Sequence, residues 1–199
     1  MTQQELREEI KMLHWPDTPE KELPTPLLNK LIWKAYVRAV TLGHVYGLNT
    51  DVSLSSGSYD MANIADFYEP RWFEYSTTGK LKKIGYEHIQ TVPTAINDSL
   101  YYYYQKGKTL YVVNGDDETI TVYYWAYPPA LTNDTTSFVL DDQFSGVITA
   151  RVNWQIAQGK DPKRVPGYIA SYNQEFADMK QYYIKKYTTG RGYVMPMDY

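Results

Sequence analysis

The spacing of apolar residues changes twice along this chain of 199 residues, and this change restricts the fold more than any other feature. Residues 1–47 and 129–187 carry apolar side chains three and four positions apart, the spacing of amphipathic helices. Between them, residues 48–128 alternate apolar and polar side chains in short runs separated by turn residues, which is typical of β-strands. The sequence therefore predicts an α+β fold, with a β-rich insert between two pairs of helices.

Two helices are expected at the N-terminal end. Residues 2–13 begin with Thr2 and Glu5 in the spacing of a capping box, which predicts a capped helix start. The second helix begins at Thr25, its expected N-cap, and ends at Gly43. The predicted apolar faces comprise Leu6, Ile10 and Leu13 in the first helix, and Leu28, Leu31, Ile32, Ala35, Ala39 and Leu42 in the second.

Two further helices are expected after the insert. Asp141 or Asp142 is the expected cap of the first, which ends at Gly159, and the second covers residues 168–187. Their predicted apolar stripes comprise Phe144, Val147, Ile148, Val152 and Ile156, followed by Ile169, Tyr172, Phe176, Met179, Tyr183 and Tyr187. We expect the four helices to bury these stripes against one another as a bundle.

Three runs, residues 100–105, 109–114 and 119–126, carry the strongest strand signals of the insert. Lys106-Gly107 separates the first two runs and Gly115-Asp116-Asp117 separates the last two, so both connections have turn-forming residues. The three runs together predict an antiparallel β-meander. We expect a single domain over the whole chain, divided into N-terminal helices 1–47, the insert 48–128, C-terminal helices 129–187 and an extended tail 188–199.

The residues that carry chemistry in enzymes are scarce or wrongly spaced. The chain has no cysteine, which excludes disulfides, thiolate nucleophiles and cysteine-ligated metals. No pair among His14, His44 and His88 has the helical spacing of a metal site. Residues 107–109, Gly-Lys-Thr, resemble the end of a Walker A loop, but Tyr102 stands where that motif needs a glycine. We therefore expect no enzymatic activity, no cofactor and no bound metal.

The charge of the chain also restricts its partners. The formal net charge is −3, and no run of four or more Lys or Arg occurs, so the sequence lacks the basic patch of a protein that grips nucleic acid. The charged N-terminal segment predicts neither a signal peptide nor a transit peptide. No stretch approaches 18 apolar residues, so we expect no membrane partner.

Tyrosine is unusually frequent, with 21 of 199 residues, and residues 99–113 read SLYYYYQKGKTLYVV. Tyrosine offers a large contact area, tolerates water and is enriched where proteins meet proteins. The strand period places Tyr101 and Tyr103 on one face and Tyr102 and Tyr104 on the other, so one pair is expected in the core and the other against a partner. The interface hypothesis comprises Tyr102, Tyr104, and the tail residues Tyr193, Met195, Met197 and Tyr199.

The order of segments resembles a known family. LYYYYQKGKTLYVVNGDDETITVYYWAYPPAL (residues 100–131) is followed by the polar linker TNDTTSFVLDDQF, the helical segment SGVITARVNWQIAQGKDP and a last long helix. This arrangement resembles the head-to-tail adaptor, or connector, proteins of tailed bacteriophages over residues 25–187. The chain departs from the family pattern in its long aromatic segment 59–92 and in its tail.

The resemblance implies a non-enzymatic virion structural protein, made in the cytoplasm of the host bacterium. Such proteins form a ring, commonly a dodecamer, in the neck between the portal protein and a tail or nozzle protein. The ring extends the DNA channel, and DNA is only passing cargo. The expected partners are therefore further copies of the chain, the portal and the tail.

Two other functions stay open from the residues alone. A Tyr-rich β surface is also typical of a carbohydrate- or protein-binding module of a tail or fibre. A hydrolase could assemble its site from distant carboxylates, although Asp116-Asp117 and Asp141-Asp142 have simpler explanations as turn and cap residues. A closed ring would favour the adaptor, and a monomer that binds glycans would favour the binding module.

Overall fold

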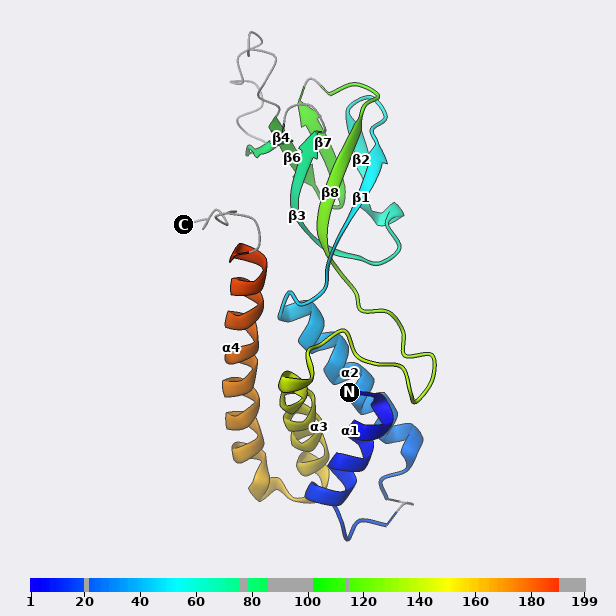
Figure 1. The fold of residues 1–199 in the computed structure, drawn as a ribbon, viewed down its shortest axis with the longest axis vertical. Helices are drawn as coiled ribbons and strands as arrows, with labels where there is room; N and C mark the ends of the chain where they lie inside the picture. Colours follow the sequence, from blue (N-terminus) through cyan, green and yellow to red (C-terminus); the bar gives the residue numbers. More distant parts are fainter. Residues whose placement is uncertain (20–21, 76–78, 86–101, 114, 190–199) are drawn as a thin grey trace. The chain divides into compact units, whose positions relative to one another are not determined.

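The computed structural model divides the chain into two compact units (Figure 1). The helical unit comprises Met1–Tyr46 and Pro128–Tyr199, and the β unit comprises Gly47–Tyr127. The residues that the structure describes are 1–19, 22–75, 79–85, 102–113 and 115–189. The predicted α+β composition is confirmed, with helices before and after a β-rich insert in the sequence.

The described part of the helical unit contains four α-helices, and a π-helical turn follows the first of them. Their bounds are α1 Gln3–Glu9 with the π turn Ile10–His14, α2 Thr25–Leu42, α3 Ser145–Lys160 and α4 Val165–Thr189. Helix α3 packs against both α2 and α4 (Figure 1). The largest side chains of this core with less than 2% exposure are Leu6, Ile10, Leu28, Ile32, Tyr36, Ile148, Met179 and Tyr183.

The predicted helix starts are partly confirmed. Both hydrogen bonds of the capping box form between Thr2 and Glu5. The N-cap of α2 is Pro24 instead of Thr25, which is already helical. Asp141 precedes a 3-10 turn before α3 and makes no capping hydrogen bond with its side chain, so the predicted cap is wrong there. Its carboxylate instead lies 3.3 Å from Lys186 Nζ.

Leu13 does not belong to the core, contrary to the prediction, because it is 71% exposed. A π turn has i→i+5 hydrogen bonds and therefore advances fewer degrees per residue than an α-helix. The apolar face that holds Leu6 and Ile10 is lost at this turn, and Leu13 and its neighbour Met12 point outward, Met12 with 67% exposure.

Two four-stranded sheets form the β unit. The first has the order β1 (Gly47–Ser53), β8 (Thr119–Ala126), β3 (Phe67–Tyr75) and β4 (Gly79–Lys80). The second has the order β2 (Ser58–Asp60), β7 (Thr109–Val113), β6 (Tyr102–Lys106) and β5 (Lys82–Lys83). The pairs are antiparallel except for β5 and β6, which run parallel. The β unit is therefore a two-sheet structure, and both sheets draw strands from distant parts of the insert.

The predicted meander is correct for two strands and wrong for the third. Strands β6 and β7 form the expected hairpin, with Gly107 at a φ of 63° in its two-residue turn. Strand β8 instead lies between β1 and β3 in the other sheet. The residues just before β8 bond to the connection between β1 and β2: Leu54 N–H donates to Glu118 O at 2.7 Å, and Ser56 N–H donates to Asp117 Oδ1 at 2.7 Å. These hydrogen bonds hold the residues before β8 beside the β1–β2 connection, where the chain passes from one sheet to the other.

The core of the β unit lies between the two sheets. Phe73 of β3 is fully buried, and its ring meets the Tyr103 ring of β6 edge-on, with 4.7 Å between centroids. Tyr103 is 9% exposed, whereas Tyr102 and Tyr104 are half-buried, so the predicted alternation along this strand is confirmed. Tyr101 lies outside the described residues.

The ends of the insert lie beside each other within the β unit. Gly47, at the start of β1, pairs directly with Trp125 near the end of β8. Paired positions on neighbouring antiparallel strands are about 4.5–5.5 Å apart between Cα atoms. The insert therefore leaves and re-enters the helical sequence at adjacent points of the same sheet.

Two tyrosine hydroxyls hold the segment that leads from the insert into α3. Tyr36 Oη of α2 accepts a hydrogen bond from Val139 N–H at 3.0 Å, and Tyr183 Oη of α4 accepts one from Asp141 N–H at 3.0 Å. Leu140, between these two amides, is 4% exposed. Helices α2 and α4 therefore fix the same three residues from two sides, and we call this arrangement the tyrosine clip.

Candidate interaction surfaces

The described residues do not assemble a recognisable catalytic or metal centre. Within them, no three His, Asp or Glu side chains come together as possible metal ligands. His14 packs edge-on against Tyr168, with 5.9 Å between ring centroids, and burial lowers the pKa of its imidazole. His88 lies outside the described residues. Among the described helices, none combines the length and apolar character needed to cross a membrane.

Two of the six residues of the interface hypothesis have described positions. Tyr102 and Tyr104 lie on the same face of β6, opposite to Tyr103. The Tyr104 ring stacks on Tyr111 of β7, with 4.8 Å between centroids and 5° between planes. The other four, Tyr193, Met195, Met197 and Tyr199, lie outside the described residues.

Cations and aromatic rings alternate on the outer face of the first sheet. The Arg71 guanidinium carbon lies 4.4 Å from the Trp72 ring centroid and 4.2 Å from that of Trp125. Lys80 Nζ lies 4.5 Å from the Trp72 ring, and Tyr123 stacks on the same ring at 4.5 Å. A sugar that stacked on Trp72 would have to displace one of these groups. This arrangement therefore offers the carbohydrate-binding alternative no free aromatic platform at Trp72.

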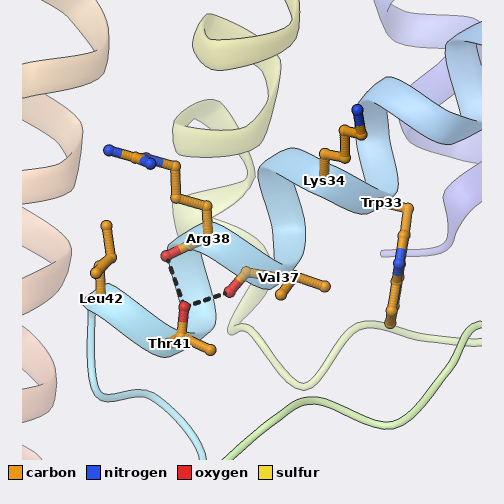
Figure 2. A pocket seen from close by; sticks show the side chains of 6 residues that line it. All are labelled: Trp33, Lys34, Val37, Arg38, Thr41 and Leu42. Carbon is orange, nitrogen blue, oxygen red and sulfur yellow. Dashed lines mark hydrogen bonds between the residues drawn. The ribbon is translucent and has the colours of Figure 1, made fainter. Parts of the chain in front are cut away.

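The helical unit has a shallow hollow of about 340 Å³ along α2 (Figure 2). Figure 2 shows Lys34, Arg38 and Leu42 pointing to the same side of the helix, with Trp33 directed away from them. The Thr41 hydroxyl donates to the carbonyl oxygens of Val37 at 2.9 Å and Arg38 at 3.4 Å, so it is engaged within the helix. The exposed atoms of this hollow therefore come mainly from cationic and apolar side chains.

Four cationic side chains of α2 and α3 form what we call the basic strip: Lys30, Lys34, Arg38 and Arg151. The three on α2 are four positions apart and share one side of the helix. Arg151 lies with its guanidinium carbon 4.0 Å from the Trp154 ring. Burial and, next, the charge of Arg38 lower the Arg151 pKa, so the two guanidinium groups are near each other. The strip is not evident in the sequence because its members are not consecutive.

A second hollow, of about 830 Å³, lies where the connection after α1 meets the turn between α3 and α4. Four of its charged residues form ion pairs: Lys160 Nζ lies 2.7 Å from Glu22, and Arg164 Nε lies 3.0 Å from Asp161. Leu13 stands at its edge. The Lys160–Glu22 pair joins the two connections, and the Arg164–Asp161 pair lies within the turn between α3 and α4, which gives this hollow a structural role.

One family model matches almost the whole chain. The family model described as SU10 adaptor protein matches residues 1–195. No curated protein matches the chain. The family match confirms the resemblance to head-to-tail adaptor proteins that the order of segments in residues 25–187 indicates. A structural adaptor implies a non-enzymatic component of the virion that contacts other head and tail proteins. The chain belongs to the SU10 adaptor protein family and is a structural adaptor protein of a bacteriophage.

Proposed function

We propose that the protein forms a closed ring in the neck of the virion, where it joins the portal to the tail and extends the DNA channel. The observation that carries this proposal is the family match over residues 1–195. The ring is proposed to contain twelve subunits and to bind the portal protein on one side and a tail or nozzle protein on the other. DNA passes through it without specific contacts.

The surface chemistry supports a mechanical role. The net charge of −3 suits a conduit, because a surface that neutralises many phosphates would hold the DNA that has to pass. A ring also binds its axial partners through many copies at once, so each contact can be weak while the attachment is strong. Broad, moderately apolar surfaces such as the half-buried face of Tyr102 and Tyr104 fit such contacts.

The tail sequence extends this proposal to a specific contact. We propose that Tyr193, Met195, Met197 and Tyr199 bind a neighbouring subunit or the portal, since aromatic and methionine side chains make adaptable apolar contacts. A variant that lacks residues 190–199 keeps all of α4, so the deletion leaves the described fold intact. We expect it to attach to portal rings more weakly than the full chain. Equal attachment would contradict the role of the tail.

The ring itself is tested on the purified full chain. Native mass spectrometry and negative-stain electron microscopy, with and without isolated portal rings, give the subunit number and the shape. We expect closed twelve-subunit rings, alone or seated on the portal. A chain that stays monomeric under both conditions, and does not co-sediment with portal rings, would refute the proposal.

A further inference from the structure

The basic strip carries a positive charge that no Asp or Glu of the described residues neutralises. Lys30, Lys34 and Arg38 are exposed, and Arg151 is half-buried against Trp154. Among the described residues, no Asp or Glu forms an ion pair with any of the four. Arg38 and Arg151 even repel each other, which contributes to the lowered pKa of Arg151.

An opposite charge accumulates at the junction of α1, α3 and α4, on what we call the acidic set: Glu9, Glu175 and Asp178. Glu175 lies directly against α3, since a β-carbon at Gly146 would overlap its carboxylate. Glu9 accepts a hydrogen bond from Thr149 Oγ1 at 3.5 Å. In the described part of the chain, no Lys or Arg pairs with any of the three. Burial, then Asp178 and Glu9, raise the pKa of Glu175.

Helix α3 separates the two charged regions. Arg151 belongs to the basic strip, whereas Thr149 contacts Glu9 of the acidic set. Because an α-helix turns by about 100° per residue, these two positions point about 160° apart around the axis of α3. On α4, Asp178 and Lys180 also point about 160° apart. Tyr172, whose ring centroid lies 5.7 Å from the Arg151 guanidinium carbon, points between them. The basic strip and the acidic set therefore lie on different sides of the helical unit.

We infer that the basic strip of one helical unit docks on the acidic set of the same unit in a second copy of the chain. A contact between two different surfaces of identical subunits repeats around a ring and closes when the rotation fits. Each subunit then neutralises its neighbour's uncompensated charge, with Leu42 of the α2 hollow as an apolar part of the contact. This inference rests on the proposed ring and names the surfaces that build it.

Charge reversal at one exposed residue on each side tests the inference on the full chain. Arg38→Glu places a carboxylate within the basic strip and Asp178→Lys places an ammonium group within the acidic set, so each variant meets a like charge across the proposed contact, and neither residue is part of the buried core. Each variant alone is expected to need at least about ten times the wild-type subunit concentration to form rings. A tenfold weaker contact corresponds to about 1.4 kcal/mol, and like charges placed opposite each other in an interface cost more than that. Lys163→Glu and Asp116→Lys change the charge equally at exposed positions outside both regions and are the matched controls.

The decisive measurement is an equimolar mixture of the two variants. In the proposed contact residue 38 of one subunit faces residue 178 of the next, so Arg38→Glu presents its new carboxylate to the new lysine of Asp178→Lys, and the reverse contact has wild-type charges. We therefore expect alternating rings to form again in the mixture, which native mass spectrometry identifies by their two subunit masses. A role of either residue in folding alone would not produce this mutual rescue.

Three results would overturn the inference in distinguishable ways. If the wild type forms rings and both variants do so equally well, the docking surfaces are wrong and the proposed ring stands. If Arg38→Glu keeps the ring but lowers binding to fluorescent duplex DNA, the basic strip is a DNA contact. If the wild type forms no ring, with or without the portal, the proposed function fails together with the inference.

Discussion

Removing the two hydroxyls of the tyrosine clip should weaken the helical unit in a way that depends on both tyrosines. Tyr36→Phe and Tyr183→Phe each delete the acceptor of one backbone N–H, of Val139 and Asp141, and leave the rings in place. Both phenols are at most 2% exposed, while the two amides are in part-buried positions that water can partly reach. We expect each variant to lower the free energy of unfolding by about 1–2 kcal/mol.

The two substitutions should not be additive. Val139 and Asp141 flank Leu140 in one short segment. Losing the hydrogen bond at one end makes the segment more mobile, so the bond at the other end contributes less to stability. Residues that share such a segment show coupling of about 0.5 kcal/mol or more in double-mutant cycles. The cost of the double variant is therefore expected to be smaller than the sum of the two single costs.

Urea unfolding followed by circular dichroism measures these changes, and a heat denaturation series provides an independent check. For a chain of this size each kcal/mol corresponds to a shift of about 2–4 °C in Tm. Tyr182→Phe is the matched control, because Tyr182 is 38% exposed and makes no hydrogen bond with its hydroxyl within the described residues. If both clip variants match this control within about 0.5 kcal/mol, which is the spread of ordinary surface changes, the clip contributes nothing.

Three further predictions concern the core and the turns. Phe73→Ala should lower the stability of the β unit by about 3–5 kcal/mol, measured by urea unfolding, because it removes a fully buried ring between the sheets. Gly57→Ala should cost more than Gly107→Ala by the same assay: both glycines have positive φ, but only at Gly57 would the new β-carbon collide with a backbone oxygen, that of Gly115. Burial raises the pKa of Tyr36 from 10.0 to about 12. The contribution of Tyr36 to stability should therefore be full below pH 10 and decrease as the pH rises toward 12, as measured by urea unfolding at each pH. Tyr36→Phe should reduce that decrease.

Local patterns predicted the helices well, because they depend on neighbours in the sequence. The capping box of Thr2 and Glu5 and the apolar stripe of α2 each involve residues within one or two helical turns. The π turn Ile10–His14 was not predicted, since its apolar residues are compatible with an ordinary helix and its widening is decided by packing. The exposure of Leu13 follows from that turn.

Long-range pairing was beyond the sequence pattern. The alternation in β8 indicates a strand and an inner face, but it does not say whether the strand pairs with β7 or with β1 and β3. Hydrogen bonds of Asp117 and Glu118 to the β1–β2 connection decide between these partners, and they join residues more than sixty positions apart. The basic strip is similar, because the charge of Arg38 acts on Arg151 only after α2 and α3 pack.

The pairing of Gly47 with Trp125 has a consequence for the order of folding. In the unfolded chain, α2 and α3 are separated by about a hundred residues, and closing so long a loop carries an entropic cost that grows with its length. Once β1 and β8 pair, the two ends of the insert are neighbours, and the effective loop between the helices shrinks to little more than the segment that contains the tyrosine clip. If β1 and β8 pair first, α2 and α3 pack together at a lower entropic cost of loop closure. A change that slows this strand pairing should therefore also slow the packing of the helices.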